Sequence, residues 1–198
     1  MPRPVTISTQ HIVECARAQF LEHGSGVPTS AIALAAGISE GTIFKRFPTK
    51  MALFAAAMGL PEPSFLDALP ARVGTGAIRD QLMLLGAEIH EFYLDLMPRI
   101  MMIMSRGALL EQVFADDSDE APPPIRVLRG VQRYFEMEEG SGRLSCPHSE
   151  LAARMFVGTI VHAVLLNLRV PKTGEHIITD RETLLTQLVD TLLQGVAK

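Results

Sequence analysis

Small, cationic and aromatic residues lie together in one short stretch of this sequence. Gly41 and Thr42 begin the stretch, and Phe44, Lys45 and Arg46 follow them. If the stretch forms a helix, the small residues at its start allow a partner to come close to the backbone. The two cations would neutralise phosphate groups, and the phenyl ring would lie against a sugar or a thymine methyl group. This set of residue types therefore indicates binding to double-stranded DNA.

Two short helices joined by a tight turn are needed to present these side chains. Thr29 or Ser30 is predicted to cap the first helix, Gly37 supplies the turn, Ser39 caps the second helix and Pro48 ends it. A second helix that exposes small and basic residues after such a turn fits the major groove, as in a helix-turn-helix. An ordinary helical hairpin with a solvated basic face has the same spacing and is the alternative at this point.

The composition and the apolar spacing predict an all-α protein. Strand-forming runs are scarce, since the 198 residues include ten Met, nine Phe, two Tyr and no Trp. We expect an N-terminal three-helix DNA-binding unit with the helix-turn-helix over residues 1–58 and a larger C-terminal helical domain over residues 59–198. Helices are predicted over residues 9–23, 77–96, 98–114, 125–139, 147–169 and 180–196, with a further one opening at Thr49.

Charge is distributed unevenly along the chain. Residues 1–58 carry five Lys or Arg and three acidic residues, a net charge of +2, which leaves −6 for the remainder of a chain whose net charge is −4. A basic N-terminal segment in an acidic chain favours contact of that segment with phosphates.

Nothing in the sequence predicts a membrane, disulfide or metal role. The N-terminus lacks the apolar core of a secretory signal, and the most apolar stretch, residues 151–168, includes Arg154 and His162. Cys15 and Cys146 lie far apart, without the spacing of a zinc site. We therefore expect a soluble cytoplasmic protein with no membrane contact, no metal and no cofactor.

The stretch from Ile32 to Lys50, IALAAGISEGTIFKRFPTK, resembles the signature of TetR-type bacterial regulators. That signature reads Ile-Ala, two variable residues, Ala-Gly-Val-Ser, one variable residue, Gly-Thr, an apolar residue, Tyr, two variable residues and Phe, and then a Lys that opens the next helix. The rest of the chain fits the family only by its length and helical content. The resemblance implies a transcriptional regulator, most often a repressor, that binds a palindromic DNA operator as a homodimer and is released by a small-molecule effector.

The resemblance also implies roles for single residues. Thr29 and Thr42 would contact phosphate, Ser30 and Lys45 would occupy base-reading positions, and Lys50 would meet the DNA backbone. The complete predicted DNA-contact set is Thr29, Ser30, Gly41, Thr42, Phe44, Lys45, Arg46 and Lys50.

This sequence departs from the family pattern at three of the neighbouring positions. Phe44 stands where Tyr is usual and lacks its phosphate-contacting hydroxyl. Met51 replaces the usual Glu, and Arg46 stands where an aromatic residue or His is common. These departures leave the operator sequence and the phosphate contacts open.

The last two predicted helices carry apolar stripes. Ala152 and Gly158 allow close helix approach in the first of them, and Leu184, Leu188 and Leu192 belong to the stripe of the second. The stripes can complete an intramolecular core, or they can pair with their copies in a four-helix homodimer interface. The resemblance favours the homodimer, because such regulators read two half-sites.

Flexible apolar side chains crowd the middle helices of the larger domain. A thioether adapts readily to an apolar ligand, although most Met clusters are simply core. The resemblance places the pocket for an apolar small-molecule effector in this region. The predicted ligand-binding residues are Phe92, Met97, Met101, Met102 and Met104.

No arrangement of residues predicts catalysis. The segment Gly74-Thr75-Gly76 is too short for a phosphate-binding loop, no GxSxG motif is present, and the His residues are scattered. We expect no enzyme activity and no catalytic residue. The alternative to a DNA-binding regulator is a helical adaptor that binds only protein, which would show no salt-dependent affinity for DNA.

Overall fold

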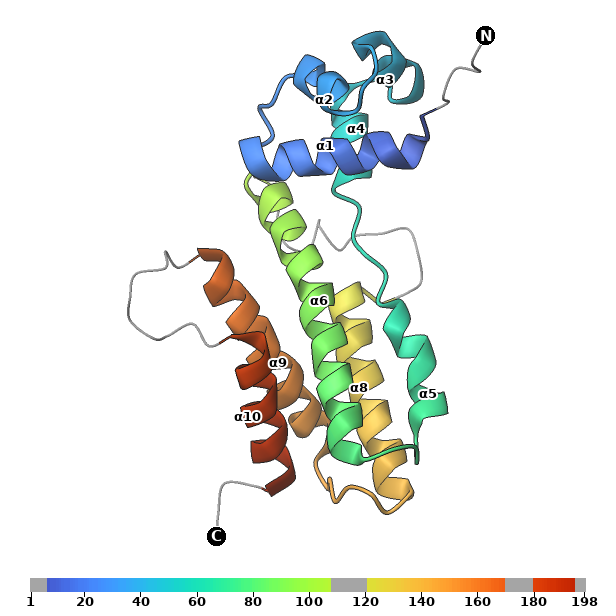
Figure 1. The fold of residues 1–198 in the computed structure, drawn as a ribbon, viewed down its shortest axis with the longest axis vertical. Helices are drawn as coiled ribbons and strands as arrows, with labels where there is room; N and C mark the ends of the chain where they lie inside the picture. The colour runs from blue at the N-terminus through green and yellow to red at the C-terminus, as the bar shows by residue number, and fades with distance from the viewer. Residues whose placement is uncertain (1–6, 108–120, 170–179, 195–198) are drawn as a thin grey trace. The chain divides into compact units, whose positions relative to one another are not determined.

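The computed structural model describes residues 7–107, 121–169 and 180–194. Every regular element in these ranges is a helix, which confirms the all-α prediction. The chain divides into two units (Figure 1). Unit 1 contains Met1–Leu60 with Pro98–Ala115, and unit 2 contains Pro61–Met97 with Asp116–Lys198. The sequence-based boundary between residues 58 and 59 lies close to the change from unit 1 to unit 2 after Leu60. The sequence-based division placed residues 98–115 in the C-terminal domain, whereas in the structure they belong to unit 1.

Unit 1 is built around the inner face of its first helix. Its bounds are α1 Thr9–His23, α2 Thr29–Ala35, α3 Glu40–Arg46 and α4 Lys50–Ala57. Ile12, Ala16 and Phe20 of α1 are fully buried. The ring of Phe20 meets that of Phe54 edge to face, with centroids 5.1 Å apart. α1 packs against α2 and α4, and α2 packs against α3, so that one core positions all four helices.

Local signals set the ends of these short helices. The Ser39 Oγ accepts a hydrogen bond of 3.3 Å from the Thr42 N–H, and the Thr49 Oγ1 accepts one of 3.0 Å from the Ala52 N–H. Both N-caps were expected from the sequence, because the short side-chain oxygens of Ser and Thr satisfy the free N–H groups of a first turn. Gly37 has φ +68°, the left-handed conformation that the tight turn between α2 and α3 requires.

The predicted cap of α2 is wrong. Pro28 occupies the N-cap position and makes no side-chain hydrogen bond there. Thr29 is instead the first residue inside the helix, and Ser30 follows it. Proline already has the extended backbone that precedes a helix, so α2 begins earlier than a side-chain cap would place it.

The predicted break at Pro98 is also wrong, because α6 runs from Ile78 to Met104 as one helix with Pro98 inside it. Proline removes one helical hydrogen bond and usually ends or kinks a helix. Here Leu96 and Ile100, on the two sides of the proline, are both buried. Packing of α6 within each unit therefore outweighs the cost of the missing bond.

The last turns of α6 belong to unit 1. The Arg99 Nη1 donates a hydrogen bond to the carbonyl oxygen of Gly59. The Arg106 guanidinium lies 4.7 Å from the centre of the Phe54 ring, a cation–π geometry. Met102 and Ile103 pack against the core of unit 1. The helix end is thus fixed to α4 and to the segment that follows α4.

Unit 2 is a helical bundle with a continuous apolar core. Besides the first part of α6 it contains the 3-10 helix Ser64–Ala68, α5 Leu69–Arg72, α8 Pro123–Gly140, α9 Ser149–Arg169 and α10 Arg181–Gln194 (Figure 1). α8 packs against α9, and α9 packs against α10. Gly86 lets α6 approach Leu185 of α10 closely, since a Cβ at position 86 would lie 2.8 Å from the Cδ2 atom of Leu185.

A buried carboxylate ties the end of α8 to the loop before α6. Glu138 is 0% exposed and lies 3.5 Å from the Arg143 guanidinium. Its oxygens accept hydrogen bonds from the Tyr134 hydroxyl at 2.7 Å and from the Gly74 N–H at 3.4 Å. Burial and the bond to this carboxylate raise the pKa of Tyr134 well above its usual value, so the phenol stays protonated.

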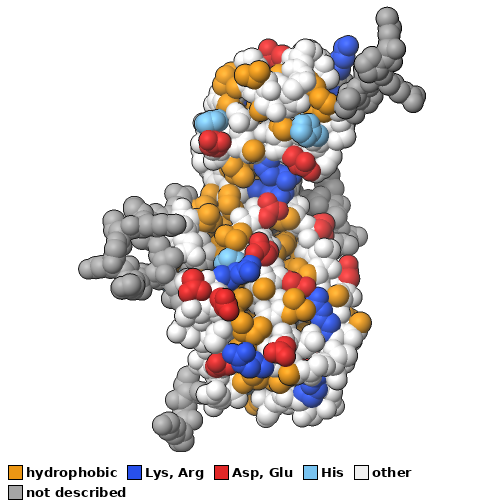
Figure 2. Space-filling view, viewed as in Figure 1, with side chains coloured by type: hydrophobic (Ala, Val, Ile, Leu, Met, Phe, Trp, Pro, Cys, Tyr) orange, Lys and Arg blue, Asp and Glu red, His pale blue; other side chains and the backbone are white. Residues whose placement is uncertain are grey.

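Ion pairs join the outer surfaces of α6 and α10. Arg79 donates to Asp190 at 2.8 Å, and Arg181 pairs with Glu91. Figure 2 shows basic and acidic side chains intermixed over this face of unit 2. Such exposed pairs contribute little to stability, because solvent and salt screen the attraction between the charges.

α9 is long and apolar enough to cross a membrane by length and composition, over Ser149–Leu168 with a mean hydropathy of 1.7. Its inner side chains Phe156, Ile160 and Val164 are fully buried in unit 2. A core helix of a soluble bundle meets the same criterion, so the composition of α9 is only weak evidence for a membrane span.

Candidate nucleic-acid interface

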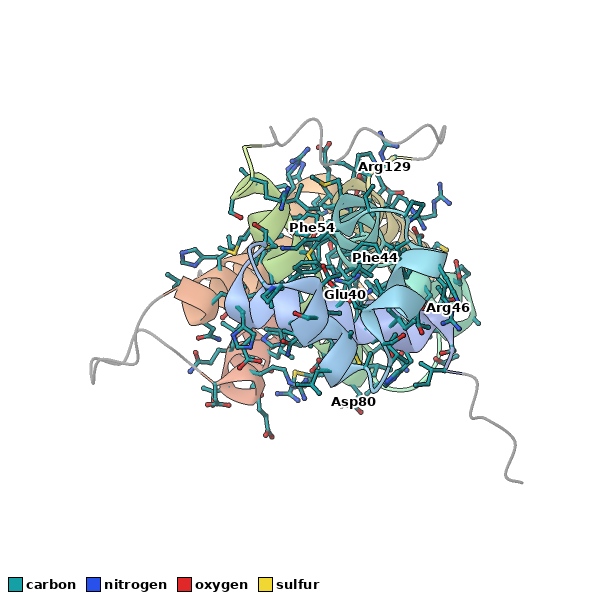
Figure 3. The ribbon with its side chains drawn as sticks, turned by 90° about the horizontal axis from the view of Figure 1, so that it is seen from above. Glu40, Phe44, Arg46, Phe54, Asp80 and Arg129 are labelled. Atoms are coloured by element: carbon teal, nitrogen blue, oxygen red, sulfur yellow. The ribbon has the colours of Figure 1, made fainter. Side chains whose placement is uncertain are left out.

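α3 presents a mixed surface of small, aromatic and basic groups. Ile43 is fully buried and Phe47 is nearly so, which fixes the inner face of the helix. Gly41, Phe44 and Lys45 are exposed on the outside, and the Phe44 side chain is 42% exposed. Figure 3 labels Phe44 along α3 between Glu40 and Arg46. This face can contact a groove in the way that the sequence predicts.

The start of α3 is open to a partner. A Cβ added to Gly41 would meet only the Ser39 Oγ, at 3.9 Å. The Thr42 hydroxyl lies 2.9 Å from the same oxygen, so this side chain is half-buried within the N-cap. On α2, Ser30 is exposed, whereas Thr29 is buried. A phosphate contact by Thr29 would therefore need its side chain to become accessible.

The three predicted cations have different surroundings. Lys45 is exposed, and Lys50 is half-buried as the first residue of α4. Arg46 turns back into unit 1, where its Nη2 donates a hydrogen bond of 2.7 Å to the carbonyl oxygen of Ile7. Unit 1 thus brings Ser30, Lys45 and Lys50 to the surface, but it does not bring the Arg46 guanidinium there.

Sequence reasoning missed two large apolar side chains that unit 1 exposes. Leu34 of α2 is 83% exposed and Met51 of α4 is 54% exposed. The helical spacing carried a signal for Leu34, because it lies two residues from both Ile32 and Ala36, which are buried, and so falls on the opposite side of α2. An exposed leucine on a surface of this kind can lie against sugar or thymine methyl groups.

The helix-turn-helix region matches a known family model. Residues 12–57 match the model described as bacterial regulatory proteins, tetR family. The helix-turn-helix unit of this chain therefore matches the TetR family. No curated protein matches it significantly in sequence.

Solved structures share the fold over nearly the whole length of this chain. The TetR family transcriptional regulator PfmR from Thermus thermophilus has a TM-score of 0.61 at 15% identity, over 94% of this chain and 99% of that one. The fatty acid degradation regulator FadR from Bacillus halodurans has a TM-score of 0.55 at 17% identity, over 96% and 100%. FadR from Bacillus subtilis, in complex with stearoyl-CoA, has a TM-score of 0.54 at 18% identity, over 96% and 100%.

Three of the five residues that the sequence assigned to dimerisation, all of them on α10, line a groove in unit 2. Leu184, Leu188 and Leu192 of α10, together with Met155 of α9, line a groove of about 460 Å³ between the two helices. Gly158 is exposed and a Cβ there would meet nothing within 4 Å, so the surface of α9 is open. Ala152, Leu184, Leu188 and Leu192 are each half-buried.

The residues that the sequence assigned to ligand binding divide between the two units. Phe92 is buried in unit 2, where its ring meets those of Phe65 and Tyr93 edge to face with centroids 6.0 and 5.2 Å apart. Met97, the last residue of that part of α6, is half-buried. The other three belong to unit 1: Met101 and Met102 are half-buried there, and Met104 is exposed.

Metal ligands do not cluster in the part of the chain that the structure describes. No group of three His, Cys, Asp or Glu side chains lies close enough there to hold an ion. Cys15 and Cys146 are both free thiols.

Proposed function

We propose that this DNA-binding regulator is a repressor that occupies a palindromic operator as a homodimer and leaves it when an apolar effector binds. The exposed face of α3, with Gly41, Phe44 and Lys45 behind a capped glycine turn, supports the groove contact. The net charge of +2 over residues 1–58, in a chain with −4 in total, supports phosphate binding by the same unit. A DNA-binding protein of this kind works in the cytoplasm, and the proposal assigns it no catalytic step.

Two lysine variants separate base reading from phosphate binding. Lys50→Ala is expected to weaken binding to all DNA sequences alike, because a phosphate contact carries no sequence information. Lys45→Ala is expected to relax the preference at one operator position, with a loss there of about 1 to 3 kcal/mol. Affinities for the operator and for random DNA are measured side by side by fluorescence anisotropy, on DNA from the promoter region of the chain's own gene.

A matched control is Arg129→Ala, which removes one positive charge from an exposed position of α8 in unit 2 (Figure 3). It is expected to leave operator affinity unchanged. Equal losses on operator and random DNA for Lys45→Ala would refute its role in base reading. A wild-type protein with no salt-dependent DNA affinity would instead favour the adaptor alternative.

The homodimer is proposed to form through α9 and α10. Met155 of α9 is 58% exposed and lines the apolar groove together with Leu188 and Leu192. Leu151, one turn earlier on α9, is 56% exposed. Large apolar side chains gathered in this way mark interaction surfaces on soluble proteins. In the proposed homodimer, a second copy would cover this apolar surface of α9 and α10 with the same surface of its own. The two subunits would then present two α3 helices to the two half-sites.

The effector is proposed to be a molecule with a long apolar chain, such as an acyl-CoA. The stearoyl-CoA complex of the Bacillus subtilis neighbour supports this class of ligand. In this chain the half-buried Phe65 and the buried Phe92 and Tyr93 form an aromatic cluster in unit 2 that an apolar chain could contact, and burial raises the pKa of Tyr93 to about 12. An effector of this kind can act only by binding the DNA-incompetent state more tightly.

Stearoyl-CoA is the probe for effector binding. We expect it to raise the melting temperature of the wild-type protein and to lower its operator affinity, whereas CoA without an acyl chain does neither. Phe92→Trp should weaken both responses and leave ligand-free operator affinity nearly unchanged, because Phe92 lies in unit 2. Met102 is a poorer choice, because it packs against the core of unit 1. An unfolded Phe92→Trp would show that this position is core, and the absence of any response to acyl-CoA probes would contradict this effector class.

A further inference from the structure

We infer that Arg46 is a positioning residue for operator binding, which fixes the C-terminal end of the recognition helix α3 to the start of α1. The inference rests on the proposed function, since it concerns how that DNA-binding surface is held. Arg46 is the last residue of α3, and its Nη2 donates a 2.7 Å hydrogen bond to the Ile7 carbonyl oxygen, 39 residues away in sequence. Arg46 lies toward the side of unit 1 where α1 begins (Figure 3).

In this structure the Arg46 guanidinium is directed into unit 1. Its Nη2 is occupied by Ile7, and its Nη1 is buried without a hydrogen-bond partner. To meet a phosphate, Nη1 would first have to leave the interior of unit 1. A buried donor without a partner is unfavourable, so the hydrogen bond from Nη2 to Ile7 must help to hold the guanidinium inside unit 1.

The acceptor belongs to a well-fixed part of the unit. Ile7 is half-buried and packs against the core of unit 1. The next residue, Ser8, caps α1 by accepting a hydrogen bond of 3.1 Å from the His11 N–H. A guanidinium bound at Ile7 is therefore bound to the rigid beginning of α1.

α3 needs such a tie because it is short. A helix of seven residues is not stable alone, and its direction depends on its packing and on the bonds at its ends. Ser39 holds the N-terminal end through its cap, Ile43 holds the middle through the core, and Arg46 holds the C-terminal end. Loss of the last tie would let the exposed face with Phe44 and Lys45 tilt away from its reading geometry.

The test compares Arg46→Met with Lys50→Met, which removes the same charge at the proposed phosphate contact, the first residue of α4. Operator affinity is measured across a range of salt concentrations. Arg46→Met should bind about tenfold more weakly, the scale of one charge-assisted hydrogen bond, with the slope of log affinity against log salt unchanged. Lys50→Met should reduce that slope by about one, as loss of a phosphate-contacting cation does. Arg46→Lys should recover part of the affinity, because an ammonium group can still donate to Ile7.

Amide hydrogen exchange of the DNA-free protein supplies a second readout. Arg46→Met should speed exchange in the first turn of α1, which a phosphate-contacting arginine would not do. A reduced salt slope for Arg46→Met with unchanged exchange would overturn the inference and assign Arg46 to phosphate. An unchanged operator affinity would overturn it as well. If Arg46→Met fails to fold, operator affinity and amide exchange are measured for Arg46→Lys instead. A wild-type protein that binds no DNA would refute the proposed function itself.

Discussion

Replacing Leu188 and Leu192 together with glutamate is expected to give a monomer that no longer binds the operator. Both leucines line the groove between α9 and α10 that we propose to be covered by a second copy. Each glutamate would place an unpaired charge in an apolar interface, a cost that a dimer of ordinary strength cannot offset. A single reading head keeps one half-site, so operator affinity should fall by about 10³ or more, toward the level of non-specific binding.

Sedimentation velocity measures the oligomeric state, and anisotropy with the operator measures the affinity. The control is Thr183→Glu with Gln194→Glu, which adds the same charge to exposed positions of α10 outside the groove lining. It should remain a dimer with unchanged affinity. If Leu188→Glu with Leu192→Glu still sediments as a dimer, the subunits meet through another surface.

Glu138→Ala is expected to destabilise the protein more than any other single change considered above, by about 3 to 5 kcal/mol. The substitution removes the carboxylate that faces Arg143 and leaves the buried hydroxyl of Tyr134 without its acceptor. Arg143 also donates to the backbone carbonyls of Thr75 and Gly76, so the loop before α6 should loosen with it. Chemical denaturation at fixed protein concentration measures the loss, because dimerisation makes stability depend on concentration.

Glu150→Ala is the matched control for that measurement. Glu150 is a carboxylate whose side chain is 60% exposed, and it pairs with Arg154 one turn along α9. Its loss should cost only about 0.3 to 0.5 kcal/mol. Comparable losses for the two variants would mean that the buried cluster around Glu138 contributes little, and would contradict the importance assigned to it.

The helix ends of unit 1 could be predicted because their causes are local. Ser39, Gly37 and Thr49 act within three or four residues of where they stand, and the sequence displays these distances directly. The bounds of α1, Thr9 to His23, were predicted correctly for the same reason. The exposed face of α3 follows from the burial of Ile43, which helical spacing alone indicates.

The features that were missed have distant causes. From the sequence, Arg46 was predicted to be an exposed cation like Lys45, because its partner is a backbone carbonyl far away in sequence. Glu138 lies in an acidic run that looks solvated, although it falls one turn after Tyr134 on the inner face of α8. Pro98 reads as a helix end, and only the packing of Leu96 and Ile100 carries α6 through it. Local patterns cannot show contacts that the tertiary fold creates.

The acceptor for Arg46 is a main-chain oxygen, which every amino acid at position 7 would supply. In this chain, position 7 can therefore vary among residues of suitable apolar size without loss of the acceptor, whereas the side chain at position 46 must supply a donor that reaches it. Phe44 and Lys45, the two residues before Arg46, are exposed, and we assign them no role in holding α3 in place. A combinatorial library that randomises these two positions and retains Arg46 is therefore the most direct way to engineer regulators with new operator preferences on this scaffold.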